Sequence, residues 1–278
     1  MAVRIINEPW RTYIASFRVY GDLYFIGNRS VCSWLIDTTF PQTVYQMIDG
    51  IYRLGFSPTD IRYVLHTHGH CDHMGGSRSI RDLTQASFCI GADDVDVCEH
   101  RGELSEAELY GVEFSSHFTI DQALYDGDIV EVGNTQVSCV HTPGHTPGTM
   151  SYFFNIDGER GSYRVGMQGG PGVHTLVDKY LATHDLPESL RDSYVTSIGH
   201  LRQEHVDIHL TGHPGQSSIF QRKEGVDSGD PLVFIDPGRG SKYFDHLETG
   251  FYKKNSLFDR DGSSIRVGLA PRELCAFG

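Results

Sequence analysis

The chain has 278 residues, of which 39% are hydrophobic and 21% charged, the balance of an ordinary globular protein. Its formal net charge of −13 opposes contact with phosphate backbones and anionic bilayers, so we expect no nucleic acid and no membrane as a partner. The six cysteines form no Cys-x-x-Cys pair, and no run approaches the roughly 18 apolar residues of a membrane span. The first residues lack the apolar core of a signal peptide, which favours a cytoplasmic protein.

The first quarter of the chain is predicted as short strands followed by one helix. Hydrophobic residues recur at helical spacing from Val44 to Leu54, and Gly55 can end this helix. A buried strand, IRYVLHT (61–67), follows and delivers a cluster of histidines at its end. The earlier strands are bounded by turn residues and cover 16–21, 23–27 and 30–37.

Strands and helices continue to alternate along the chain, which predicts an α/β layered protein. Helices are expected from Gly75 onward, over 92–100 and over about 187–203. Residues 100–120 lack a clean period, which is typical of a lid or binding loop. The further strands are predicted at 87–91, 128–133, 135–142, 148–156, 162–167 and 206–213.

A soft boundary is predicted near 223–231. The main domain would cover residues 1–225, which carry all the predicted strands. Residues 226–278 contain one predicted helix and a polar tail, too little for a second hydrophobic core. We therefore expect this C-terminal part to pack on the same domain.

The motif His-x-His-x-Asp-His, at 68–73, follows the strand at 61–67. Zinc prefers nitrogen, sulfur and carboxylate ligands, and neighbouring positions in a loop point in different directions. We therefore expect His68 and His70 to face one metal, and Asp72 and His73 to face a second. His66 lies earlier on the strand, where packing under the site or bonding to a ligand is the better prediction.

Two later histidines could complete these metal sites. His145 lies in VHTPGHTPGT (140–149), where proline and glycine on both sides form a rigid turn at a strand end. His141 competes with His145 for the same role. His213 ends another predicted strand, and with the first cluster it would bring the set to three ligands per metal.

The segments THGHCDHMGG (67–76), HTPGHTPGT (141–149) and GHP (212–214) strongly resemble the metallo-β-lactamase superfamily. The resemblance covers most of residues 15–220 and implies a four-layered αβ/βα sandwich, with 1–225 as the metallo-hydrolase domain. It implies two zinc ions with a water or hydroxide between them, although iron and manganese can occupy similar ligand sets. The implied ligands are His68, His70 and His145 for one ion, and Asp72, His73 and His213 for the other.

The ligand pattern also separates branches of this superfamily. Flavodiiron oxidoreductases have Glu in place of His70, and β-lactamases of the first subclass have Arg in place of His73 and a later Cys ligand. Glyoxalase II, lactonases, tRNA-processing nucleases and persulfide dioxygenases place a metal-binding Asp in a strand that here reads RVGMQGGPG (164–172), without Asp or Cys. The remaining pattern resembles the third subclass of metallo-β-lactamases. Two departures are a hairpin that is shortened around 33–43 and the lack of an export signal.

The resemblance implies a hydrolase in which metal-activated hydroxide opens an amide or ester bond of a small molecule. Asp72 would bind metal and act as a general base, and His174 would face the substrate, with His117 as a weaker candidate. Cys71 is interpreted as a packing residue, and His200, His205 and His209 as exposed or packed. A β-lactam is the leading substrate; a cytoplasmic lactone or thioester hydrolase and a non-catalytic metal-binding protein remain as alternatives, and the oligomeric state stays open.

Overall fold

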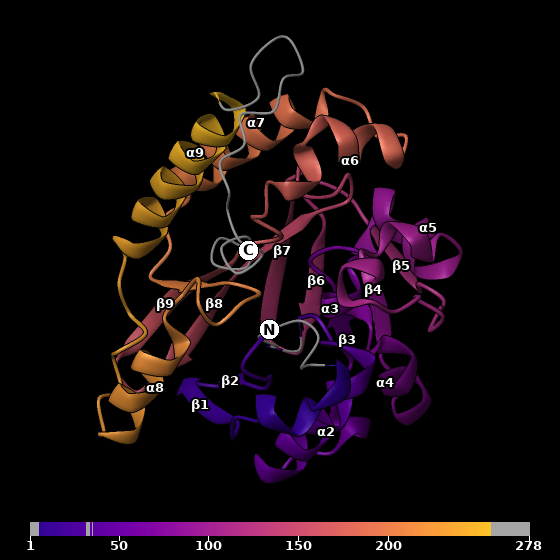
Figure 1. Ribbon diagram of the computed structural model, residues 1–278. Helices are drawn as coiled ribbons and strands as arrows, with labels where there is room; N and C mark the ends of the chain where they lie inside the picture. Colours follow the sequence, from indigo (N-terminus) through magenta and orange to yellow (C-terminus); the bar gives the residue numbers. More distant parts are fainter. Residues whose placement is uncertain (1–5, 32–33, 35, 257–278) are drawn as a thin grey trace.

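The computed structural model describes residues 6–31, 34 and 36–256 of the chain (Figure 1). The strands are β1 Phe17–Tyr20, β2 Leu23–Phe25, β3 Tyr63–Leu65, β4 Ser87–Gly91, β5 Gln122–Leu124, β6 Ile129–Val132, β7 Thr135–His141, β8 Met150–Gly158, β9 Gly161–Met167 and β10 Ile208–Leu210. The α-helices are α2 Val44–Arg53, α3 Cys71–Met74, α4 Ser77–Leu83, α5 Val95–Glu99, α6 Asp178–Thr183, α7 Leu190–Gln203, α8 Ile219–Asp227 and α9 Arg239–Ser256.

The strands form two larger sheets and one hairpin. The five-stranded sheet has the order β10-β9-β8-β7-β6, in which β6 to β9 are antiparallel and β10 runs parallel to β9. The three-stranded sheet has the order β3-β4-β5 and is parallel throughout. Strands β1 and β2 pair with each other as an antiparallel hairpin.

The burial of alternate residues along single strands shows how the sheets are layered. In β4, Cys89 belongs to the core between the sheets, whereas Phe88 and Ile90 face the core shared with α2, α4 and α5. In β8, Tyr152 faces the core between the sheets and Phe153 faces α7 and α9. Helices therefore cover the outer face of each sheet, which is the predicted four-layered αβ/βα sandwich (Figure 1).

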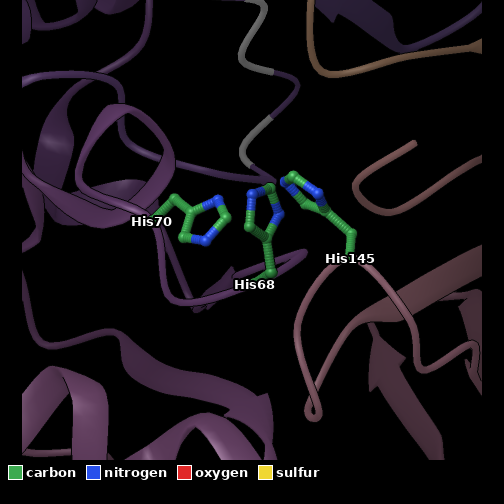
Figure 2. A group of neighbouring side chains, drawn as sticks. All are labelled: His68, His70 and His145. Atoms are coloured by element: carbon green, nitrogen blue, oxygen red, sulfur yellow. The ribbon is translucent and has the colours of Figure 1, made fainter. Parts of the chain in front are cut away.

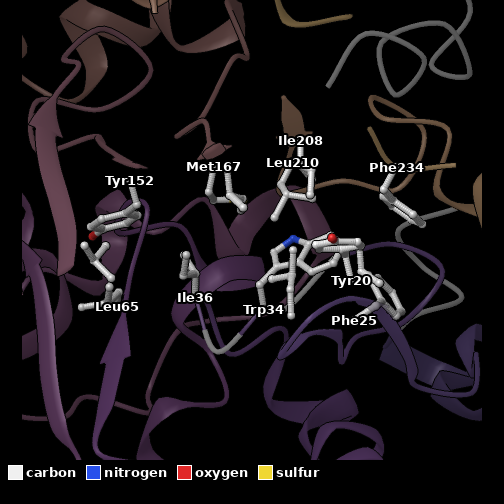
Figure 3. Close-up of a cluster of buried hydrophobic side chains, with 14 of the residues drawn as sticks. Tyr20, Phe25, Trp34, Ile36, Leu65, Tyr152, Met167, Ile208, Leu210 and Phe234 are labelled. Carbon is white, nitrogen blue, oxygen red and sulfur yellow. The ribbon is translucent and has the colours of Figure 1, made fainter. Parts of the chain in front are cut away.

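The core between the sheets joins all three strand groups. Figure 3 shows side chains from the β1–β2 hairpin, from β3 and from β8 to β10 packed together, including Phe25, Leu65, Tyr152 and Leu210. These side chains are almost fully buried, and each would stabilise the fold by about 1.5–3 kcal/mol through removal of apolar surface from water. The core fixes the two sheets against each other and so fixes the strand ends that carry the histidines.

Most of the predicted elements are confirmed, with one clear error. The predicted strand at 30–37 is wrong for the residues that are described: Ile36 makes only an isolated bridge to Leu65. Cys32, Ser33 and Leu35 lie outside the described residues. The predicted shortening of the hairpin around 33–43 therefore stays a prediction. The short strand β5 was not predicted, because its three residues alternate too little to mark a strand without β4 beside them.

The C-terminal part contains helix α9, and it is preceded by α8, which was not predicted. Helix α8 runs across the predicted boundary at residue 225, and the division into two parts stays a prediction. Phe244 and Phe251 of α9 pack with Tyr194 and Ile198 of α7 in one hydrophobic cluster. Within the described residues, the helices are too short or too polar to cross a lipid bilayer.

Candidate metal centre

The predicted motif lies at the carboxyl end of the three-stranded sheet. Strand β3 is buried and ends at Leu65, and the chain then runs through a loop to His70, which precedes the short helix α3. The loop carries His68 and His70, and α3 carries Asp72 and His73. All four side chains are buried, so this segment presents its polar groups to the interior of the molecule.

Six side chains converge in two groups of three. Within each group, the potential ligand atoms all lie within 4.8 Å of one another. The first triad comprises His68, His70 and His145, and the second triad comprises Asp72, His73 and His213. Figure 2 shows the first triad, with the ring of His145 reaching in from the loop between β7 and β8 toward the rings of His68 and His70.

Hydrogen bonds on the far side of the rings orient the imidazoles. The Nδ1 atoms of His145 and His213 lie 2.8 Å from the carbonyl oxygens of Gly172 and Ser30, respectively. Such partners hold Nδ1 as the protonated nitrogen and leave Nε2 with a free lone pair, as in the outer ligand shells of metal sites. The Nε2 atoms of His68 and His70 are buried and make no hydrogen bond in the described structure.

The unpartnered nitrogens fit a metal better than an ordinary polar core. A buried polar atom without a partner costs about 1–3 kcal/mol, so two such atoms side by side call for a ligand that the chain itself does not supply. Burial, followed by the neighbouring imidazoles, lowers the pKa of each histidine of the first triad well below its ordinary value. These imidazoles are therefore neutral at physiological pH, which is the form that binds metal.

The second triad has a different charge balance. Burial alone would lower the pKa of His73, but Asp72 and Asp37 outweigh it and raise that pKa to about 9. The Nδ1 atom of His73 lies 2.7 Å from Asp37 Oδ2, and its Nε2 atom lies 3.3 Å from the Nε2 atom of His213. Without a metal ion, the positive charge of protonated His73 offsets the negative charges of Asp72 and Asp37. A bound cation would take over that role.

Asp37 connects both triads and was not singled out in the sequence. Its carboxylate accepts hydrogen bonds from the backbone and the hydroxyl of Thr67, and Thr67 Oγ1 in turn lies 2.9 Å from His68 Nδ1. Asp37 is fully buried and adopts a positive φ of 67°, an uncommon conformation for a residue other than glycine. The signal for it in the sequence was only a polar residue at the end of an apolar segment.

The irregular segment 100–120 supplies two more groups that the sequence did not mark. It folds into short 3₁₀ turns, Gly102–Leu104 and Ala107–Tyr110, over the histidines. Tyr110 donates its hydroxyl proton to Asp72 Oδ2 over 3.2 Å. Glu106 is buried, has a φ of 59°, and places its carboxylate 3.3 Å from His70 Nδ1.

His174 lies beside the first triad, and its substrate-facing role stays a prediction. Its Nε2 atom lies 2.9 Å from both carboxylate oxygens of Glu106, and its ring packs edge-on against His145 with centroids 5.4 Å apart. Its side chain keeps 36% of its surface exposed, so the pair formed with Glu106 is open to solvent on the His174 side.

The other histidines lie outside both triads. Both ring nitrogens of His66 have partners, Cys89 O at 3.0 Å and Ser77 Oγ at 2.7 Å, so His66 packs beneath the site. The Nε2 atom of His141 lies 2.8 Å from the carbonyl oxygen of Pro147, and the Nδ1 atom of His117 lies 3.1 Å from the carbonyl oxygen of Cys98. Cys71 packs in the core around α2 and α4, where burial raises the pKa of its thiol well above the ordinary value.

Comparisons with known proteins agree with this geometry. The sequence profile of the metallo-beta-lactamase superfamily matches residues 20–158, which is half of the chain. An N-acyl homoserine lactonase of a Bacillus species is 27% identical over 207 residues, covering 72% of this chain and 66% of that protein. A probable metallo-hydrolase of Burkholderia pseudomallei is 32% identical over 107 residues, 38% of this chain and 35% of that protein. The chain thus matches less than two thirds of the length of either relative.

Solved structures match almost the whole fold. The native FEZ-1 metallo-beta-lactamase from Legionella gormanii has a TM-score of 0.80 at 27% identity, over 88% of this chain and 97% of that one. BJP-1, a subclass B3 metallo-beta-lactamase of Bradyrhizobium japonicum, shares the fold at 24% identity, with a TM-score of 0.79 over 90% of this chain and 97% of that one. Because the profile matches half of the chain and the fold agrees, the chain belongs to the metallo-beta-lactamase superfamily.

Proposed function

We propose that the two triads bind two metal ions, with zinc as the expected metal, and that the protein hydrolyses a small cyclic amide or ester. The observation that carries this proposal is the convergence of six buried ligand groups in two triads, with unpartnered Nε2 atoms on His68 and His70. Ions bound there would lower the pKa of a coordinated water toward about 7 and polarise a substrate carbonyl.

The residues around the triads have definable roles in such a reaction. Asp72 would contribute a ligand oxygen and act as the general base that takes the proton of the attacking water. Tyr110 donates a hydrogen bond to the same carboxylate and so fixes its orientation. His174, exposed on one side and held by Glu106 on the other, would contact the substrate.

A β-lactam is the leading substrate. This choice is supported by the FEZ-1 metallo-beta-lactamase, which covers 88% of this chain at 27% identity, and by the absence of Asp and Cys from residues 164–172. The second candidate is a lactone, which is favoured by the match to a Bacillus N-acyl homoserine lactonase over 72% of this chain.

The experiment is hydrolysis of a chromogenic cephalosporin and of an N-acyl homoserine lactone by the zinc-loaded protein, with and without a chelator. Chelator-sensitive turnover of the cephalosporin, with kcat/KM of about 10⁴ M⁻¹s⁻¹ or more, supports the leading proposal. Turnover of the lactone alone selects the second candidate. A protein that binds two metal ions and hydrolyses no lactam, lactone, thioester or phosphodiester contradicts both, and would favour a metal-binding protein without catalytic activity.

A further inference from the structure

A buried carboxylate outside both triads connects the two loops that carry the first triad. Asp94 ends the 3₁₀ turn Ala92–Asp94, directly after β4, and is fully buried. It belongs to neither triad, and in the described structure it makes no hydrogen bond to an imidazole. Its position is therefore unexplained by metal binding alone, and a buried carboxylate of this kind is costly unless it is well bonded.

The carboxylate of Asp94 accepts three hydrogen bonds from two loops. The backbone N–H of Gly69, the residue between His68 and His70, donates to Oδ2 over 2.9 Å. On the other side, the hydroxyl of Thr146 donates to Oδ2 over 2.6 Å and the backbone N–H of Gly148 donates to Oδ1 over 2.8 Å. Thr146 directly follows His145, so one carboxylate is hydrogen-bonded to both loops that carry the first triad.

Two glycines allow the loop that carries His145 to approach this close. A Cβ atom on Gly148 would lie 2.5 Å from the backbone nitrogen of Asp94. A Cβ atom on Gly91, at the end of β4, would lie 2.0 Å from the carbonyl oxygen of Gly148. Backbone atoms block both positions and cannot move aside as a flexible side chain could. The end of β4 and the His145 loop are therefore in direct backbone contact.

We propose that Asp94 is a positioning residue for the first triad, which holds His145 in register with His68 and His70 through the two loops. The proposal rests on the proposed metal binding by that triad. In the part of the chain that the structure describes, the second triad makes no hydrogen bond to Asp94: His73 is held by Asp37 and His213 by the carbonyl of Ser30. Loss of the Asp94 carboxylate should therefore weaken one metal site and leave the other unchanged.

Asp94→Asn is the sharpest variant because it keeps the shape of the side chain. An asparagine has one accepting oxygen and one NH₂ group, so whichever way it turns, the N–H of Gly69 or of Gly148 faces another donor. Asp93→Asn is the matched control, since it removes the same charge one residue earlier from a side chain that is 64% exposed. Loss of a partner in the outer ligand shell typically lowers metal affinity by about 10- to 100-fold.

The test combines a metal titration with amide hydrogen exchange. Zinc affinity is measured by competition with a chromophoric chelator, with His145→Ala and His213→Ala as references for the loss of one site each. We expect Asp94→Asn to weaken the step that His145→Ala abolishes by about 10- to 100-fold, and to leave the other step unchanged. Unchanged affinity at both sites, or equal loss at both, would overturn the proposal, because equal loss indicates only a general structural role.

Hydrogen exchange keeps the test independent of metal binding. In the metal-free protein, exchange of the Gly69 and Gly148 amides should be faster in Asp94→Asn than in the wild type and in Asp93→Asn. If the wild type bound no metal, the proposed function would fail, whereas faster exchange would still support the role of Asp94 in holding the loops. Native exchange rates in Asp94→Asn would refute that role in either case.

Thr146 provides a second route if Asp94→Asn does not fold. Thr146→Val removes only the hydroxyl that donates to Asp94, and Thr146→Ser keeps it. The valine variant should weaken the first-triad metal step and the serine variant should restore it. Equal affinity in the two variants would contradict the proposed connection.

Discussion

His209 makes the stability of the fold depend on pH in a calculable way. It lies on β10, is 2% exposed, and neither of its ring nitrogens has a hydrogen-bond partner in the described structure. Its ring packs against Tyr243 and Phe244 of α9, with centroids 5.0 Å and 5.6 Å away. Burial, and then the positive charges of Arg222 and Arg239, lower its pKa from 6.5 to about 3.

The sign of the effect follows from this direction. Because the folded state holds the proton less tightly than the unfolded state, the contribution of His209 is fully present above pH 6.5 and is lost as the pH falls toward about 3. Each pKa unit corresponds to about 1.4 kcal/mol, so lowering the pH to about 5 should remove about 2 kcal/mol through this residue. That is a large share of the stability of a typical domain, which is about 5–15 kcal/mol.

Urea unfolding of the wild type and of His209→Leu, near neutral pH and near pH 5, measures this contribution. Acid should destabilise the wild type by about 2 kcal/mol more than the leucine variant, and the effects of all other groups cancel in that difference. The control is His205→Leu, which removes a histidine whose side chain is 73% exposed. Lowering the pH to about 5 should destabilise this variant by the same amount as the wild type. Equal acid sensitivity of the wild type and His209→Leu would refute the reasoning.

Three further predictions concern the metal centre. Gly170→Ala would place a methyl group 1.9 Å from Cδ2 of His145, so chelator competition should show loss of the first-triad metal. The control Gly199→Ala adds a methyl group with open space around it and should bind both metals normally. Its free energy of unfolding in urea should rise by up to about 1 kcal/mol. Tyr110→Phe removes the hydrogen bond to Asp72 and should lower kcat by about 10-fold or more with the metal content unchanged in elemental analysis; an unchanged kcat would exclude a role for this hydroxyl. Removal of metal by dialysis against a chelator should lower the melting temperature, and re-addition of zinc should restore it; identical melting curves would contradict metal binding to the folded state.

The candidate metal ligands were predictable because their spacing is local. His68, His70, Asp72 and His73 lie within six residues, and the end of β3 turns this sequence spacing into a spatial cluster. His145 and His213 could be added because each follows a strand of the sheet. The structure brings all six together in the two predicted groups, although the ligand roles themselves stay a proposal until metal is measured.

The groups around the ligands were not predictable for a physical reason. Glu106 and Tyr110 lie in a segment without periodicity, and only the folded path of residues 100–120 brings them to the histidines. Asp94 and Asp37 accept hydrogen bonds from backbone and hydroxyl groups 25 to 54 residues away in the chain, and no short pattern encodes such contacts. Sequence patterns thus identify the candidate metal ligands, whereas their supporting hydrogen bonds follow from the tertiary fold.

The most direct test of the account is the zinc content of the wild type, His145→Ala and His213→Ala after loading and desalting. Two separate triads predict two zinc ions per chain in the wild type and one in each variant, with His145→Ala retaining the ion of the second triad and His213→Ala that of the first. A wild type that retains no zinc, or variants that each retain two ions, would contradict the assignment of the two triads as the metal centre.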